Sequence, residues 1–132
     1  MRRHELLEQE LTRSVIGAFF EVYNTLGFGF LEHLYVRALE RELMARGHGV
    51  TREVAVPVCY KGAHLGYQRV DMIVDDKVVV ETKATEALHK SSFRQLHSYL
   101  RATSLEVGLL LHFAPDKASF YRFVCSRNRQ SA

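Results

Sequence analysis

The sequence predicts one α/β domain with a mixed sheet flanked by helices. Two stretches with helical spacing come first, three strand-like stretches follow, and a third helical stretch then separates two further strands. The chain has 132 residues, 47% hydrophobic and 25% charged, which is enough to bury one ordinary core. We therefore expect a single domain over residues 1–132, with frayed ends at about 1–5 and 126–132.

Two amphipathic helices are expected at the start of the chain. Residues 6–26 have apolar side chains at helical spacing, and Gly27 is placed to end that helix. A second helix is expected from close to Glu32 to Gly47. Its apolar stripe consists of Leu31, Leu34, Tyr35, Ala38 and Leu39. Glu32 flanks the stripe and could lean over the edge of the sheet, although an acid in the first turn also simply stabilises the helix dipole.

The remaining elements form a meander followed by a helix and two strands. Residues 50–60, 64–74 and a strand from Val78 predict three antiparallel strands, and Pro57 makes the first an edge strand or gives it a bulge. Residues 84–101 predict a helix, the apolar run 105–113 an interior strand, and 119–124 a last strand. One face of the predicted helix is lined by His89, Phe93, Leu96 and Leu100.

The stretch from Val70 to Lys83 holds the candidate site, because acids and a lysine interrupt an apolar alternation. The apolar residues expected on one buried face are Val70, Met72, Val74, Val78 and Val80. Glu81 and Lys83 share the other face. Asp71 joins them only if the loop is odd in length, and a three-residue loop at 75–77 pairs Asp71 with Glu81. A two-residue turn would instead mix acids and valines on both faces.

Paired carboxylates on neighbouring strands predict a metal site. They repel each other, and a divalent cation between them relieves the repulsion most effectively. The stretch from Lys83 to Arg101 is net positive, because it also contains Lys90 and Arg94 and its single acid is Glu86. Such a stretch suits a polyanionic partner. The whole-chain charge of +3 permits such a partner without requiring one.

Structural explanations compete with this interpretation. An acid followed at a distance by Glu-x-Lys is a weak pattern, since hairpins often carry charges near their ends. Lys83 alone would be a solvated charge, and Gln95 with Tyr99 a hydrogen-bonding pair on a helix surface. Cys59 and Cys125 lack the spacing of a disulfide framework, and no histidine pair has zinc-ligand spacing.

The ends and hydropathy of the chain bear on its location. Charges stand where a signal peptide needs an apolar core, and no apolar run approaches the length of a membrane span. We expect a cytoplasmic protein that does not contact membranes.

Four short motifs occur together between Leu11 and Val124. They are G-x-x-E-x-x-Y at Gly29, Glu32 and Tyr35, R-x-D at Arg69 and Asp71, E-x-K-A at Glu81 to Ala84, and Q-x-x-x-Y-L at Gln95 to Leu100. With these motifs the chain resembles the GxxExxY protein family, a branch of the PD-(D/E)xK nuclease-like superfamily. The resemblance implies a restriction-endonuclease-like αβββαβ core.

The same resemblance implies roles for the site residues. Asp71 and Glu81 would hold Mg²⁺ or Mn²⁺, Glu32 would complete or orient the metal site, and Lys83 would position the attacking water. Carboxylates nearby favour the charged form of a lysine, so we expect Lys83 to stabilise charge rather than act as a general base. In the strand after the helix, where the family pattern leads us to expect asparagine, this chain has His112.

Nucleic-acid contacts are expected from the helix and the strand before the site. Gln95 and Tyr99 match a motif that similar nucleases place near the site and the DNA. The basic side chains of Arg94, Lys90 and Arg69 would grip the phosphate backbone without reading bases.

The expected function is that of a metal-dependent nuclease hydrolysing phosphodiester bonds of nucleic acid, with DNA as the expected substrate. The alternative is a catalytically silent scaffold that keeps the fold and binds nucleic acid or a partner. No key residue of the site is missing, which favours an enzyme. A third possibility is that the chain acts as a homodimer or with a larger protein partner.

Overall fold

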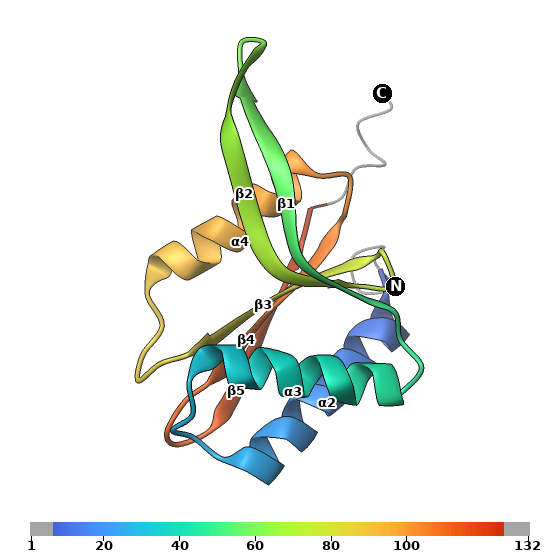
Figure 1. The fold of residues 1–132 in the computed structure, drawn as a ribbon, viewed down its shortest axis with the longest axis vertical. Coiled ribbons are helices and arrows are strands. Elements are labelled where there is room, and N and C mark those ends of the chain that lie inside the picture. Colours follow the sequence, from blue (N-terminus) through green and yellow to red (C-terminus); the bar gives the residue numbers. More distant parts are fainter. Residues whose placement is uncertain (1–6, 126–132) are drawn as a thin grey trace.

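A mixed five-stranded sheet lies between a pair of helices on one face and a single helix on the other (Figure 1). The computed structural model describes residues 7–125, so the expected frayed ends lie outside the described residues. The elements are α2 (Gln9–Leu26), α3 (Glu32–Ala45), β1 (Val50–Tyr60), β2 (Ala63–Val74), β3 (Val78–Ala84), α4 (Lys90–Ala102), β4 (Val107–Phe113) and β5 (Ala118–Val124). This arrangement confirms the predicted fold class.

The strands follow one another across the sheet in the order β1-β2-β3-β4-β5. Only β3 and β4 are parallel, and α4 makes the crossover between them, as a parallel pair requires. The first three strands form the predicted antiparallel meander. Pro57 lies in edge strand β1, and the register shifts directly after it, between Val58 and Cys59.

Apolar side chains fill both sides of the sheet. Under α2 and α3, Phe113 meets Phe19 edge to face at 4.8 Å and stacks on Tyr35 at 4.3 Å between ring centroids. On the other side, Gly108 lets α4 approach closely, because a Cβ there would lie 3.1 Å from Leu96 Cδ1. All seven residues of β4 are buried, which confirms the predicted interior strand.

Two details of the helices differ from the predictions. Helix α4 begins at Lys90 rather than near residue 84, and His89 precedes the helix as an exposed cap residue instead of lining its buried face. The buried face of α3 consists of Tyr35, Val36, Leu39 and Leu43. Leu31 and Leu34 of the expected stripe are 68% and 40% exposed, because Leu31 lies outside the helix and the buried face is rotated. Glu32 lies one turn before the buried Val36, so it is on the buried side of α3.

Among residues 7–125, no helix combines the length and the apolar character needed to cross a membrane.

A polar network fastens the end of the sheet where β2 turns into β3. The His48 ring bonds Asp75 Oδ2 through Nδ1 and Ser14 Oγ through Nε2, both at 2.7 Å. The Gly49 amide donates to Asp75 Oδ1 at 2.7 Å. This hydrogen bond is the main reason why the pKa of Asp75 is lowered, and the hydrogen bond with His48 is the second. A serine, a histidine and an aspartate bonded in this order could suggest a nucleophilic site. Ser14, however, lies inside α2, whose backbone amides are bonded within the helix and cannot form an oxyanion hole. The network therefore joins α2, the α3–β1 loop and the β2–β3 turn as a structural clamp.

Removing the histidine should weaken this clamp. His48→Ala leaves the partly buried Asp75 and Ser14 without their shared partner, so we expect the free energy of unfolding to fall by about 1 to 3 kcal/mol. Urea denaturation at pH 7 measures the loss. His97→Ala, which removes an exposed histidine on α4, is the control and should change stability little. Equal stability of the two variants would show that the clamp contributes nothing.

Candidate active site

The candidate site lies where β2 separates from β3. Of the twelve residues of β2, only Met72, Ile73 and Val74 pair with β3. Val74 pairs with Val78, so the loop has the three predicted residues, 75–77. Continued by one step, this register places Asp71 opposite Glu81, as the apolar alternation predicted.

Carboxylates replace the backbone ladder at the point of separation. The amide of Asp71 donates to Glu81 Oε1 at 2.8 Å, and the amide of Thr82 donates to Asp71 Oδ2 at 2.8 Å. The Thr82 hydroxyl donates to the same Asp71 oxygen at 2.7 Å. One oxygen of each carboxylate is thus used to hold the strands, which leaves the other for a cation or a proton.

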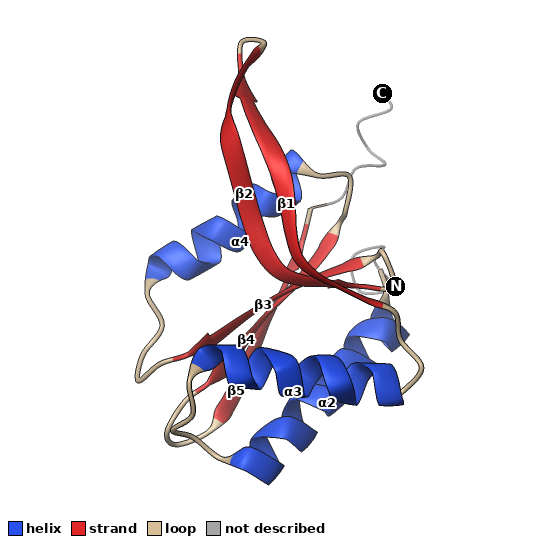
Figure 2. Cartoon of the chain, viewed as in Figure 1, coloured by secondary structure: helices blue, strands red, loops and turns tan. Residues whose placement is uncertain are grey.

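Beyond this point β1 and β2 continue as a two-stranded arm, residues 54–70, that extends away from the other strands (Figure 2). Glu53, opposite Asp71 in the β1–β2 register, has a φ of 51°, which marks the distortion where the arm departs. The alternation predicted that Val70 shares the face of Met72, and this is wrong: Val70 packs under α4. The twist at the departure point thus ends the simple two-residue pattern.

The surroundings of Glu81 strongly favour its protonated form. The pKa of Glu81 is raised to about 7, first by burial, then by the charge of Asp71, while the Asp71 amide and the charge of Lys83 oppose the shift. Burial, and then the charge of Glu81, also raise the pKa of Tyr99. A carboxyl group that resists ionisation beside a second carboxylate is typical of a functional site.

Lys83 lies one strand repeat from Glu81, on the α4 side of β3. Its neighbour on β4 is His112, which is 6% exposed and whose Nε2 lies 2.9 Å from the Thr85 carbonyl oxygen. His112 thus has the hydrogen-bonded, buried environment expected of a structural histidine, and it anchors the chain directly after the site.

Glu32 reaches the same strand from α3. Its Oε1 accepts a hydrogen bond from the Ala84 amide at 3.0 Å, two residues beyond the Thr82 amide that Asp71 accepts. Asp71 and Glu32 therefore cap successive donors, about 6.6 Å apart, along the edge of β3 that β2 has left. Within residues 7–125, no three Asp, Glu, His or Cys side chains converge closely enough to hold one metal ion. The predicted metal-binding role of Glu32 stays a prediction.

The G-x-x-E-x-x-Y motif has a structural role at this place. Gly29 has a φ of 125°, which residues with side chains rarely adopt. The Tyr35 hydroxyl donates to the Gly27 carbonyl and accepts from the Phe30 amide, so it fixes the loop before α3. The motif thereby sets where α3 begins and directs Glu32 toward β3.

A groove of about 650 Å³ runs between the arm and α4, and we call it the arm–α4 groove. Of the predicted residues, its lining includes Arg69, Glu81, Arg94, Gln95 and Tyr99. These predicted nucleic-acid contacts therefore share one groove with Glu81. Lys90 is the exception, because it starts α4 outside the lining.

Sequence reasoning missed two residues of this region. Thr82 is fully buried and hydrogen-bonded to Asp71, and the signal for it was a hydroxyl at the position where the alternation of Val78 and Val80 continues. Tyr67 lines the groove from the arm, although it is 66% exposed. A tyrosine in a strand with one solvent-exposed face gave no comparable signal of a role in a binding groove.

Comparison with known proteins identifies a family. The sequence profile described as the PD-(D/E)XK nuclease superfamily matches residues 9–123, which is most of the chain. No curated protein matches the chain.

A solved structure has a similar fold. The crystal structure of SSO0001 matches with 21% sequence identity and a TM-score of 0.58, over 94% of this chain and 62% of that one. An alkaline exonuclease from Laribacter hongkongensis (LHK-Exo) matches with 16% identity and a TM-score of 0.49, over 75% of this chain and 57% of that one. The chain thus spans about three fifths of the solved chains that it matches.

The raised pKa of Glu81 predicts that stability depends on pH in EDTA. The pKa of Glu81 is about 7 in the folded state, whereas that of a free glutamate is 4.5. The folded state then binds more protons than the unfolded state, so the free energy of unfolding should fall by about 1 to 3 kcal/mol as pH rises through this range.

A matched pair of variants isolates this effect. Glu81→Gln keeps an oxygen for the Asp71 amide but cannot ionise, so it should be more stable than wild type at pH 8 in urea denaturation. Glu86→Gln changes an exposed glutamate after β3 and should behave as wild type. A Glu81→Gln protein with the wild-type pH dependence would contradict the predicted shift.

Proposed function

Because the chain belongs to the PD-(D/E)XK nuclease superfamily, we propose that it is a metal-dependent nuclease that hydrolyses phosphodiester bonds in DNA. The observation that carries the proposal is the meeting of the Asp71 and Glu81 carboxyl groups where β2 leaves β3, with Lys83 on the same strand. The motifs around Glu32 and Tyr35 support placing the chain in the GxxExxY branch.

The carboxylates suit a hard divalent cation, for which we propose Mg²⁺ or Mn²⁺. Mg²⁺ is commonly held by one or two protein carboxylates together with water and substrate phosphate, so the pair of Asp71 and Glu81 is a sufficient donor set. Burial, and then the charge of Asp71, raise the pKa of Glu81. A cation would relieve the repulsion between the two carboxyl groups. When bound, the cation supplies an activated water and relief of phosphate charge.

The protein side chains around the pair would have separate tasks. Lys83 would place a positive charge beside the attacking water and the phosphate, where charge develops during the reaction. Glu32 would orient the site from α3, since it already holds the β3 amide at Ala84. Both side chains act from elements that the core fixes, so little ordering is needed when substrate binds.

The arm–α4 groove would hold the nucleic acid. Arg69 and Arg94 give it two positive charges against the single acid Glu81, and Gln95 and Tyr99 lie on the α4 wall. Lys90 would add a phosphate contact at the start of the helix. A second copy of the chain or a larger protein partner would extend this binding surface.

The catalytic role of Lys83 can be separated from the fold. Lys83→Ala should leave thermal stability nearly unchanged and lower the rate of Mg²⁺-dependent cleavage about 10² to 10³-fold, the usual cost of losing one charge-stabilising group. The measurement is cleavage of single- and double-stranded DNA and RNA in Mg²⁺, Mn²⁺ or EDTA.

Lys77→Ala is the matched control, because this exposed lysine lies in the β2–β3 loop at the far end of β3. It should cleave like wild type. Equal activity of wild type and Lys83→Ala would point to a contaminating nuclease, and the absence of cleavage by wild type on every substrate would favour a silent scaffold.

A further inference from the structure

The β1–β2 arm displays aromatic side chains outside any core. Tyr60 and Tyr67 are 60% and 66% exposed, on opposite strands of the arm. An aromatic ring kept in water forgoes the stabilisation that burial would give, and exposed aromatic residues are enriched where proteins bind other molecules. The two tyrosines differ in position, because only Tyr67 lines the arm–α4 groove, whereas Tyr60 lies beside the turn at the tip.

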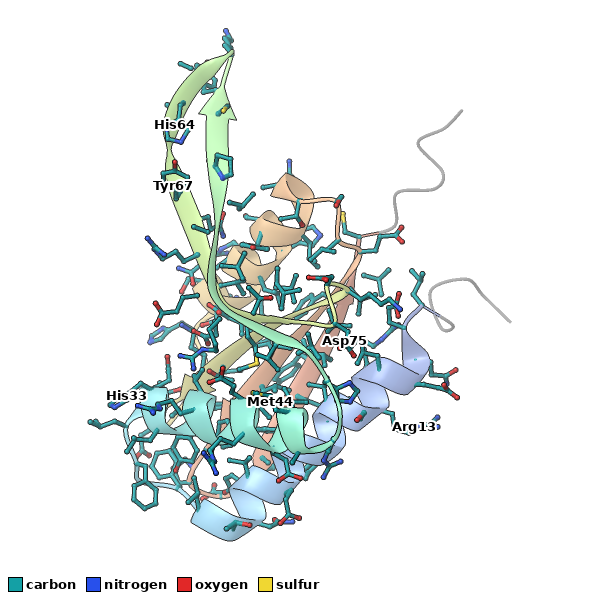
Figure 3. All side chains as sticks on the ribbon, turned by 45° about the vertical axis from the view of Figure 1, so that its right-hand side comes forward. Arg13, His33, Met44, His64, Tyr67 and Asp75 are labelled. Carbon is teal, nitrogen blue, oxygen red and sulfur yellow. The ribbon has the colours of Figure 1, made fainter. Side chains whose placement is uncertain are left out.

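The ring of Tyr67 is held but not covered. It packs against the edge of His64, with 4.9 Å between ring centroids and 67° between the ring planes. Figure 3 shows both side chains together on the projecting arm. This contact restrains the tyrosine ring while most of its surface stays accessible, which is the state that a stacking partner requires.

Tyr67 stands in line with the candidate site. Tyr67, Arg69 and Asp71 lie two residues apart along β2, with about 6.6 Å between successive Cα atoms. Asp71 lies where the twist of β2 ends the simple alternation. The first two line the groove, and the third meets Glu81 at its inner end. One strand therefore presents an aromatic ring, then a cation, then a carboxylate.

The two walls of the groove are joined near Tyr67. Gln68 donates a side-chain hydrogen bond to the Gln95 carbonyl of α4 at 2.8 Å. Arg94 adds a second cation from the α4 wall. The arm is thus held against the helix at Gln68, between Tyr67 and Arg69 in the sequence.

These features match the chemistry of an unpaired nucleotide strand. A base inside a duplex is stacked between its neighbours, so a side-chain ring can stack only on a base that is unpaired or splayed out. A groove that combines an aromatic ring with cations is the usual arrangement for single strands. Glu81 at the inner end is the single acid of the lining, so the charge becomes more favourable for phosphate toward the arm.

We propose that the arm–α4 groove binds single-stranded nucleic acid, with a base stacked on Tyr67 and adjacent phosphates on Arg69 and Arg94. This inference deepens the proposed nuclease function by naming its substrate class, and it rests on that function for the direction in which the strand runs toward Glu81. The arm is then a substrate guide, and its separation from β3 serves both the groove and the carboxylate pair.

Binding is tested in EDTA, where cleavage does not interfere. Fluorescence anisotropy is measured with a labelled single-stranded DNA, the RNA of the same sequence, and the matching DNA duplex. Tyr67→Ala should raise the Kd for the single strands about 5- to 100-fold, the range expected for one lost base stack, and leave the duplex Kd unchanged. Tyr67→Phe keeps the ring and should bind within about twofold of wild type.

Tyr60→Ala is the matched control, since it removes an equally exposed tyrosine from the same arm but outside the groove. It should bind single strands as wild type does. The proposal is overturned if wild type does not bind single strands, if Tyr67→Ala binds them normally, if duplex binding falls equally, or if Tyr60→Ala has the same effect. If single-strand binding depends on Tyr67 but no cleavage depends on Lys83, the proposed nuclease function is wrong and the proposed binding site is supported.

Discussion

The hydrogen bonds among Asp71, Glu81 and Thr82 are the constraint on which the rest of the structure depends. Where two strands separate, backbone amides lose their partners, and buried unpaired donors are costly. Here the side chains of Asp71 and Glu81 accept those donors, so β2 can leave β3 inside the protein. The separation creates the arm and one wall of its groove, and the same contacts bring the two carboxyl groups together.

This solution has an electrostatic cost. The pairing that satisfies the amides also buries one acid beside another, and burial, then the charge of Asp71, raise the pKa of Glu81. Natural proteins tolerate such local conflicts mainly at functional sites, where a ligand or substrate resolves them. At the opposite end of β3 the shift is reversed, because the Gly49 amide, and then His48, lower the pKa of Asp75.

Much of the fold and part of the site follow from local patterns. The register of Asp71 and Glu81 was predictable because burial of alternating valines excludes the two-residue turn. The order of strands and the position of Pro57 at the sheet edge were predictable from hydrophobic periods and from its missing amide hydrogen. These features depend on neighbours in the sequence.

The features that sequence reasoning missed depend on tertiary geometry. Val70 changes sides because β2 twists as it leaves β3. The buried face of α3 differs from the expected stripe because the helix is rotated by its contacts with the core. The start of α4 at Lys90 was missed because the preceding residues form the loop that His112 anchors from β4. The participation of Tyr67 required knowing that the arm folds back beside α4.

The central claim is that the carboxyl pair at the division of the sheet is a metal site. The most direct test is anomalous diffraction from crystals soaked with Mn²⁺. If the pair holds a metal ion, one strong anomalous peak lies between the carboxyl groups of Asp71 and Glu81 and is lost in Glu81→Gln. A map without a peak there, or with its strong peak beside Asp75 at the other end of the strand, would show that the pair is not a metal site.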